Sequence, residues 1–413
     1  MTSAAEPQSL LLQMLDPAHR ADPYPLYSRI REQGPVQQPG SNLTVFSSYA
    51  DCDEVLRHPH ASSDRLKSTV AQRMIADGAP PRPFGPPGFL FLDPPDHTRL
   101  RRLVSKAFVP KVVKALEPEI AALVEGLLDD ADGSFDAISG LAYPLPVAVI
   151  CRLLGVPLED EPQFSSASAL LAQSLDPFVN LTGAVGAGSE ERMAAAVWLR
   201  GYLRELIAQR RRDPGEDLMS ALIHVVGAPP ACGGESGDQL TEDEIVATCN
   251  LLLVAGHETT VNLIANAILA LLRDPAQWAA LRAEPARVSG VVEETLRYDP
   301  PVQLVGRIAA EDMTIGTVTV PKGDSTLLLL AAAHRDPDVF DRPDDFDPGR
   351  PGIRHLGFGK GPHFCIGAPL ARLEAAVALT ALTSRFPNAT LAGEPSYKQN
   401  VTLRGMSELP IAL

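Results

Sequence analysis

One cysteine lies in a segment whose residue types could support metal chemistry. Cys365 stands within residues 358–367, a stretch with three glycines and one proline, and a strong helix-forming segment follows it. Glycine permits positive φ angles and a close approach of the backbone to a flat ligand. The N–H groups and the positive dipole at a helix start stabilise a thiolate. Cys365 is therefore a candidate metal ligand, and a thiolate is a good axial ligand for heme iron.

Two other interpretations of Cys365 follow from the residue types. A lone cysteine is most often a small buried hydrophobe, and this interpretation stays open. A zinc site needs about four ligands. Only His363 is near Cys365 in the sequence, which argues against zinc.

A second group of polar residues lies in the middle of a long apolar segment. Residues 241–244 read Thr-Glu-Asp-Glu, a capping box that predicts a helix running to about Arg273. Gly256 within this helix costs about 1 kcal/mol relative to alanine, so we expect a compensating role, such as room for a diatomic ligand. The Glu258 carboxylate and the Thr259 hydroxyl could relay protons to that ligand.

The spacing of residues in this helix places four of them on one face. Leu252, Ala255, Gly256 and Thr259 follow the i, i+3, i+4, i+7 pattern. The alternative is a buried helix with a packing glycine and a threonine that bonds to its own helix. A zinc-protease helix is excluded, because it needs a histidine at position 261, which is valine.

Two further sets of charged residues have a helical spacing. His97 and Arg101 are four residues apart, so they share a face that suits an anionic group, although a solvated basic face is the alternative. Glu294 and Arg297 stand at i, i+3. On a surface, such an ion pair contributes under about 1 kcal/mol.

These motifs resemble those of the cytochrome P-450 family, from about Asp22 to the C-terminus. The family's heme-binding signature Phe-Gly-x-Gly-x-His-x-Cys-x-Gly is matched at every fixed position within residues 358–367. Ala255 to Thr259 resembles its oxygen-activation motif, and Glu294 to Arg297 its Glu-x-x-Arg helix. Residues 346–350 fit its Phe-x-Pro-x-Arg stretch.

The resemblance implies a role for each matching residue. Cys365 would be the iron ligand of heme b (iron protoporphyrin IX). Phe358 and Gly367 would shape the ligand loop, Ala255 would lie against the heme, and Glu258 and Thr259 would serve oxygen activation. The propionate ligands would be His97, Arg101, Arg307 and His363. A buried structural network would contain Glu294, Arg297 and Arg350.

The resemblance also implies a reaction and partners. One oxygen atom from O2 would enter an apolar substrate, with electrons from NAD(P)H through ferredoxin reductase and ferredoxin, and azoles would inhibit. Arg99, Arg102, Lys106, Lys111 and Lys114 form the densest basic segment of the chain, and we expect ferredoxin to dock there, although a solvated basic surface is the alternative. The alternatives are a peroxide-driven heme enzyme and a heme-based sensor without turnover.

Three apolar segments are candidates for the substrate pocket. They are the Pro-rich loop 79–91, the central helix face and the segment 302–305, with 401–403 as a further wall. The expected pocket residues are Phe89, Leu90, Leu252, Val302, Leu304 and Thr402.

Composition excludes several other classes of protein. The net charge is −15 with a pI near 5.1, whereas nucleic-acid binding needs a clustered basic surface. The five cysteines include no Cys-x-x-Cys pair, which favours a reducing cytoplasm over a disulfide framework. The N-terminus lacks the pattern of a signal peptide. The longest apolar run near the C-terminal end, 326–333, is shorter than the ~20 residues of a membrane span.

The elements that position these residues are mostly helices. Apolar spacing predicts helices over 118–130 and 193–212, and short strands around 311–330, where turn residues separate apolar ones. This pattern predicts an α+β chain, mainly α with a small segregated β region. The resemblance implies one triangular domain over 1–413, with heme between the central helix and the cysteine loop. We expect residues 1–21 to be loosely ordered.

Overall fold

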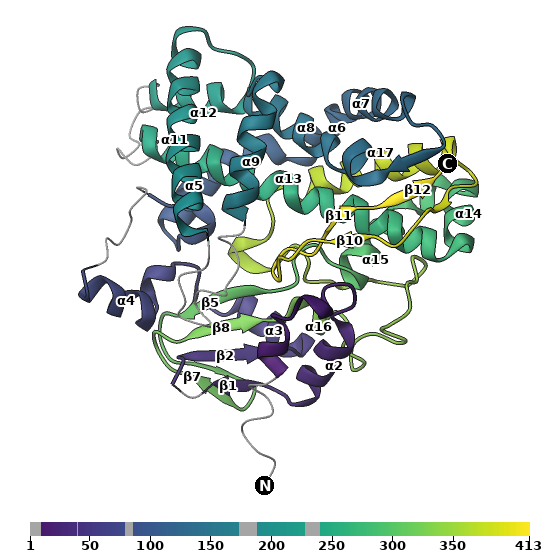
Figure 1. Ribbon diagram of the computed structural model, residues 1–413. Coiled ribbons are helices and arrows are strands. Elements are labelled where there is room, and N and C mark those ends of the chain that lie inside the picture. Colours follow the sequence, from purple (N-terminus) through teal and green to yellow (C-terminus); the bar gives the residue numbers. More distant parts are fainter. Residues whose placement is uncertain (1–9, 39, 79–85, 173–187, 228–239) are drawn as a thin grey trace.

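Helices dominate the structure, a computed structural model that describes residues 10–38, 40–78, 86–172, 188–227 and 240–413 (Figure 1). The α-helices are α2 (Tyr24–Glu32), α3 (Tyr49–Arg57), α4 (Thr69–Ala76), α5 (Asp96–Ser105), α6 (Pro110–Ala115), α7 (Glu117–Asp129), α8 (Pro144–Leu154), α9 (Glu161–Ala172), α11 (Ser189–Arg212), α12 (Leu218–Gly227), α13 (Glu242–Arg273), α14 (Pro275–Ala283), α15 (Val288–Tyr298), α16 (Leu330–Ala333) and α17 (Ala368–Arg385).

The central helix α13 begins and ends at the predicted signals. The Thr241 hydroxyl accepts from the Glu244 N–H at 3.2 Å, and the Glu244 carboxylate accepts from the Thr241 N–H at 2.8 Å, which forms the expected capping box. Asp274 ends α13, and its carboxylate caps α14, whose first residue is Pro275. Figure 1 shows α13 crossing the molecule between the main group of helices and the sheet.

Burial explains the apolar character of α13. The helix is long and apolar enough to cross a membrane, but 78% of its most apolar window is buried inside the protein. Its side chains pack against α8, α9, α11, α15 and α17. Most of the stability of such a helix comes from tertiary packing. We therefore identify α13 as the core helix of the fold.

The strands gather into one main sheet and three small ones. The strands are β1 (Val36–Gln38), β2 (Leu43–Phe46), β3 (Ala61–Ser62), β4 (Ser134–Asp136), β5 (Val305–Ala309), β6 (Met313–Ile315), β7 (Val318–Val320), β8 (Ser325–Leu328), β9 (Thr390–Leu391), β10 (Ser396–Tyr397), β11 (Met406–Glu408) and β12 (Pro410–Ala412).

The main sheet combines strands from distant parts of the chain. Its order is β1-β2-β8-β5-β3, with β2 and β8 parallel and β5 and β8 antiparallel. The strands expected around 311–330 are present as β6, β7 and β8. The strands β1 to β5 and β9 to β12 were not predicted from the sequence. The α+β class is confirmed, but the β region is not one segregated segment, because its strands come from the whole length of the chain and form four separate sheets among the described residues.

Two helix boundaries and the N-terminal segment differ from the expectations. Helix α7 lies one residue earlier than expected, and α11 begins at Ser189 rather than Met193, with Glu190 and Glu191 in its acidic first turn. Residues 1–9 lie outside the described part of the chain. Leu10, Leu11 and Met14 are buried in a core cluster, so the expected loose order is wrong for this part of 1–21.

Candidate functional site

The loop around Cys365 is a tight turn that leads directly into helix α17. The Cys365 N–H donates to the Phe358 carbonyl at 2.8 Å, which closes the turn. Gly359 and Gly361 have φ angles of +68° and +65°, and a side chain at position 361 would lie 2.9 Å from the Leu56 carbonyl oxygen. Both positions therefore require glycine. The Arg372 guanidinium lies over the Phe358 ring, with its central carbon 4.5 Å from the centre of the ring.

Opposing effects act on the Cys365 thiol. Burial is the largest effect and raises its pKa overall, although the backbone N–H of Gly367 and the Arg101 guanidinium partly offset this rise. The Arg101 guanidinium also donates to the Phe364 carbonyl, which fixes it beside the cysteine. This arrangement provides cations and N–H donors for a thiolate, as a metal ligand needs.

The predicted face of α13 lines a cavity that Cys365 also lines. Leu252, Ala255, Gly256 and Thr259 all border this cavity, whose volume is about 350 Å³. The helix is unbroken at Gly256, where a side chain would meet Ile150 at 3.4 Å. The Thr259 hydroxyl donates to the Ala255 carbonyl at 2.9 Å, the back-bonding that the sequence left open. The hydroxyl oxygen keeps lone pairs with which to accept a hydrogen bond.

Four basic side chains from three segments come together at one side of this cavity. The rings of His97 (α5) and His363 lie 4.2 Å apart, and Arg101, Arg307 (β5) and His363 border the cavity. Burial, followed by the nearby charges of Arg307, His97 and Arg101, lowers the pKa of His363 to about 3. Burial likewise lowers the pKa of Arg307 to about 10.

Protein acids do not balance this basic cluster within the described residues. Asp93 is the acid beside Arg307, but its carboxylate already accepts from Ser63 N–H at 2.9 Å and from Lys67 Nζ at 2.7 Å. Both ring nitrogens of His97 are buried without a protein partner. Because buried cations and donors need anionic or acceptor partners, the cluster suits the carboxylates of heme.

The predicted ion-pair residues form a buried network. Arg297 donates to both oxygens of Glu294, at 2.6 and 2.8 Å, and both side chains are fully buried. Arg350 approaches Glu294 at 3.4 Å. The remaining Arg297 N–H groups donate to the carbonyls of His334, Pro343 and Asp345. His334 in turn accepts from the Leu356 N–H, so the network holds the start of the cysteine loop.

All six predicted pocket residues border the cavity of Cys365. They are Phe89, Leu90, Leu252, Val302, Leu304 and Thr402. Residues 79–85 of the Pro-rich loop lie outside the described part of the chain, and Val401 does not border the cavity. The cavity walls are therefore mainly apolar, as a site for an apolar molecule needs.

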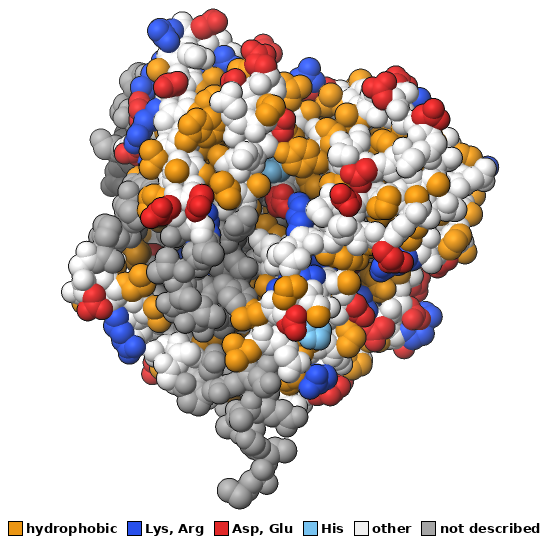
Figure 2. Space-filling view, viewed as in Figure 1, with side chains coloured by type: hydrophobic (Ala, Val, Ile, Leu, Met, Phe, Trp, Pro, Cys, Tyr) orange, Lys and Arg blue, Asp and Glu red, His pale blue; other side chains and the backbone are white. Residues whose placement is uncertain are grey.

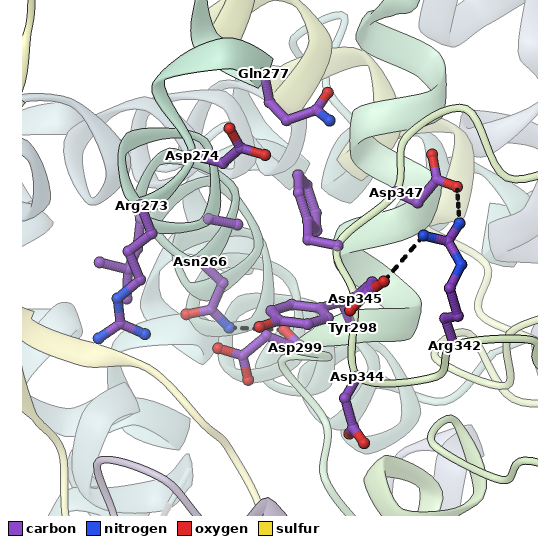
Figure 3. Close-up of a pocket in the computed structure, with 13 residues that line it drawn as sticks. Asn266, Arg273, Asp274, Gln277, Tyr298, Asp299, Arg342, Asp344, Asp345 and Asp347 are labelled. Carbon is purple, nitrogen blue, oxygen red and sulfur yellow. Dashed lines mark hydrogen bonds and ion pairs between the residues drawn. The ribbon is translucent and has the colours of Figure 1, made fainter.

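A larger hollow lies elsewhere and contains none of the predicted site residues. It has a volume of about 580 Å³ and is lined by the ends of α13 and α15 and by the loop 342–347 (Figure 3). Arg342 bonds Asp345 and Asp347 in this hollow, and Asn266 donates to the Asp299 carbonyl. The charged side chains of this hollow are largely paired with one another, so they are not available to bind a ligand. Despite its volume, the hollow is therefore not a candidate reaction site.

Two residues that sequence reasoning missed contact the predicted site. The Lys398 ammonium donates to the Glu258 carboxylate at 2.6 Å, 140 residues away in the chain. Glu374 on α17 borders the cavity, and burial raises its pKa to about 8. Glu374 could have been suspected as a lone acid among apolar helix residues, whereas no local pattern links Lys398 to Glu258.

The predicted basic segment lies at the surface in part only. Arg102, Lys106 and Lys111 are exposed. Lys114 is exposed as well, although its ammonium pairs with Glu117, whereas Arg99 is half-buried and forms an ion pair with Glu244. Phe364, next to Cys365, is also exposed. On the face shown in Figure 2, acidic and basic side chains are interspersed among apolar ones.

Comparisons with known proteins identify relatives over nearly the whole chain. The chain is 39% identical to cytochrome P-450 107B1 of Saccharopolyspora erythraea over 425 residues, covering 100% of this chain and 99% of the relative. It is 40% identical to the cytochrome P-450 monooxygenase PikC of Streptomyces venezuelae over 421 residues, covering 99% and 95%.

A solved structure is still more similar. Ligand-free CYP164A2 of Mycobacterium smegmatis superimposes with a TM-score of 0.93 at 67% identity, covering 98% of this chain and 100% of that one. The econazole-bound form of the same protein gives a TM-score of 0.92. The family model described as cytochrome P450 matches residues 36–405. The chain therefore belongs to the cytochrome P-450 family of heme-containing monooxygenases.

Proposed function

We propose that the chain hydroxylates or epoxidises a small-to-medium apolar organic molecule at a heme iron held by Cys365. Heme bound there supplies the iron that activates O2 for insertion of one oxygen atom. The observation that carries the proposal is a single cavity bordered by Cys365, by basic side chains and by Thr259. Each supplies a separate requirement: an iron ligand, an anion site and a proton donor.

In this proposal the loop and the basic cluster hold the cofactor. Phe358 and Gly367 shape the loop, because the Phe358 carbonyl accepts from Cys365 and the Gly367 N–H faces the thiol. His97, Arg101, Arg307 and His363 would bind the propionates. Ala255, which borders the cavity, would lie against the heme, where its small side chain would leave space. Glu294, Arg297 and Arg350 act structurally.

Glu258 and Thr259 move protons in the proposed reaction. A carboxylic acid beside a hydroxyl can pass a proton through that hydroxyl to a ligand in the cavity. Thr259 borders the cavity, and its hydroxyl can accept a hydrogen bond while it donates one. The intact pair favours an O2-using enzyme over a peroxide-driven one and over a heme sensor.

The proposed electron donor is a ferredoxin, reduced by NAD(P)H through a ferredoxin reductase, in the cytoplasm. Exposed Arg102, Lys106 and Lys111 support an acidic partner, since opposite charges steer association. We expect Arg102→Glu with Lys106→Glu to lower ferredoxin-dependent turnover about tenfold at low salt. The matched control is Lys322→Glu in the turn between β7 and β8. Unchanged turnover and salt dependence in the double variant would argue against this docking surface.

A carbon monoxide difference spectrum of the reduced protein tests the iron ligand. A thiolate ligand moves the Soret band to longer wavelength than an imidazole ligand does. We expect the thiolate position for the parent protein and its loss in Cys365→His. An imidazole-type band in the parent protein would overturn the proposal.

Turnover separates the oxygenase from its rivals. The purified protein is supplied with NADPH, ferredoxin reductase and ferredoxin, and is tested with myristic acid and testosterone as two apolar probes of different shape. We expect NADPH consumption with an oxygenated product from at least one probe. Product formation with peroxide alone would favour the peroxide-driven enzyme, and binding without turnover would favour the sensor. We also expect econazole to bind the heme, because a relative binds it.

A further inference from the structure

The two residues assigned to proton transfer lie in different environments. Thr259 borders the cavity of Cys365, whereas Glu258 is not among the residues that line it. The Glu258 carboxylate accepts a hydrogen bond from Lys398 Nζ at 2.6 Å instead. Its side chain is 10% exposed, so the acid is largely removed from water. In this arrangement the carboxylate is held away from the cavity that it would have to serve.

Lys398 connects this buried acid to the surface. It follows strand β10, and its N–H donates to the Gly405 carbonyl at 3.0 Å, which joins the hairpin of β10 and β11. Strand β11 packs against α13, and Figure 1 shows this hairpin beside the helix. The Lys398 side chain is 26% exposed and borders a surface hollow together with Arg20 and Tyr397. Water therefore reaches the Lys398 ammonium from the surface. The Glu258 carboxylate lies directly behind this ammonium and is hydrogen-bonded to it.

The other titratable groups near Glu258 do not replace Lys398. His257 Nε2 lies 4.0 Å from the Glu258 carboxylate, and burial lowers the pKa of this histidine, which favours its neutral form. Its Nδ1 is bonded to the Leu253 carbonyl. Tyr143 faces His257 edge-on and donates to Glu161. Among the described residues, Lys398 is thus the one cation that forms an ion pair with Glu258 apart from this weakly basic histidine.

We propose that Lys398 is a positioning residue that holds the Glu258 carboxylate at the water-accessible side of α13 until it receives a proton. Protonation by water cancels the charge of Glu258, so its attraction to the Lys398 ammonium weakens. The neutral acid then turns toward Thr259 and gives its proton to the Thr259 oxygen, which passes its own proton into the cavity. Glu258 regains its charge and pairs with Lys398 again. The inference rests on the proposed function of the Glu258–Thr259 pair.

The first test measures how well turnover is coupled to product. Lys398→Met keeps an apolar stem but removes the ammonium, and Lys398→Arg keeps a cation. With the holoenzyme, its donors and whichever of myristic acid and testosterone is turned over, we expect Lys398→Met to form about tenfold less product per NADPH. Peroxide release should rise in proportion, and the solvent isotope effect in D2O should increase. Lys398→Arg should restore at least half of the lost coupling.

The matched control is Lys322→Met. Lys322 is also paired with a glutamate, Glu311, at 2.8 Å, but both side chains are more than half exposed and lie in the β6–β7 region. We expect this variant to keep the coupling and the isotope effect of the parent protein. A merely structural role of Lys398 would lower the thermal stability without changing the isotope effect, and that result would overturn the inference.

The second test uses no turnover. Thermal unfolding of the holoenzyme is compared for the parent, Lys398→Met, Glu258→Gln and the double variant. We expect Lys398→Met to lower the Tm in the parent by several degrees, and by much less when residue 258 is glutamine, because the ion pair is then already absent. Equal decreases in both backgrounds would show that the two side chains are not coupled, which contradicts the inference.

Failure of this inference is distinguishable from failure of the proposed function. If Glu258→Gln and Thr259→Ala reduce coupling but Lys398→Met does not, the relay stands and the role of Lys398 is wrong. If all three variants keep the coupling of the parent protein, the proposed relay itself is wrong.

Discussion

Two groups of buried charged side chains contact the cysteine loop, and they differ in how their charges are satisfied. In the network of Glu294, Arg297 and Arg350, carboxylate and guanidinium groups bond to each other and to backbone carbonyls. In the cluster of His97, Arg101, Arg307 and His363, basic groups lie beside one another. Burial and the nearby arginine charges lower the pKa values of His97 and His363.

The difference indicates which group serves structure and which serves a ligand. A buried ion pair with all its hydrogen bonds made is complete without any other molecule. A cluster of guanidinium groups and imidazole donors that is largely removed from water is unfavourable unless an anion or acceptor binds it. The satisfied network therefore supports the loop, whereas the basic cluster suits the heme carboxylates.

The largest expected effect comes from breaking the satisfied network. Arg297→Met leaves the fully buried Glu294 carboxylate without its main partner, which should destabilise the protein by about 3–5 kcal/mol. Urea unfolding of the purified variant measures this change, and a low soluble yield is expected. Arg297→Lys should recover little, because lysine cannot form the bidentate pair. A loss below about 1 kcal/mol would contradict the structural role.

A substitution in the basic cluster should weaken heme binding without lowering the stability of the heme-free protein. Arg307→Met removes a half-buried cation whose partial loss of hydration lowers its pKa to about 10, so the heme-free protein should be no less stable. Loss of a charge-assisted bond of about 1.5–3 kcal/mol to a propionate should speed heme release tenfold or more. Heme transfer to an excess of a scavenging protein measures the rate. A variant with destabilised apoprotein and normal heme release would reverse our assignment.

A third set of charges near the loop gives a pH dependence. Burial raises the pKa of Glu293, but hydrogen bonds from His355 and Arg372 outweigh it and lower the pKa to about 2 from 4.5. The stabilisation from this group is therefore full above about pH 5 and is lost as the pH falls from 4.5 toward 2.

Glu293→Gln removes this contribution. Allowing for the partial exposure of the carboxylate, we expect a loss of about 2 kcal/mol at pH 7. The difference from the parent protein should shrink as the pH falls below 4.5. Unfolding free energies measured between pH 3 and pH 7 check both the size and the direction, and a pH-independent difference would argue against the pairing.

Features that depend only on residues close together in the chain could be predicted from local sequence patterns. The capping box at Thr241 and the glycine turn before Cys365 act over a few residues, so the sequence indicates them directly. The face shared by Leu252 and Thr259 follows from helix geometry alone. These short-range features make up the core of the candidate site, which is why its centre could be predicted from the sequence.

Contacts between distant segments could not be predicted in the same way. Strand β2 pairs with β8 about 280 residues later, because register depends on the packed sheet and not on local propensity. The bond from Lys398 to Glu258 spans 140 residues, and a lone lysine after a two-residue strand has no distinctive pattern. The resemblance to a family supplied Arg307 and Arg350, whose roles spacing alone did not indicate.

The smallest expected effect on the free energy of unfolding comes from an exposed ion pair, and it shows whether contact or burial determines the contribution of a charged pair. Lys322 and Glu311 lie 2.8 Å apart, close to the distance between Arg297 and Glu294, but their side chains are 63% and 58% exposed. Water already solvates both charges, so the pair gains little from its contact. We expect Lys322→Gln to change the free energy of unfolding by less than about 0.5 kcal/mol. Urea unfolding at low and high salt measures this. A loss comparable with that of Arg297→Met would mean that contact distance, rather than burial, determines how much the charged groups around the loop contribute.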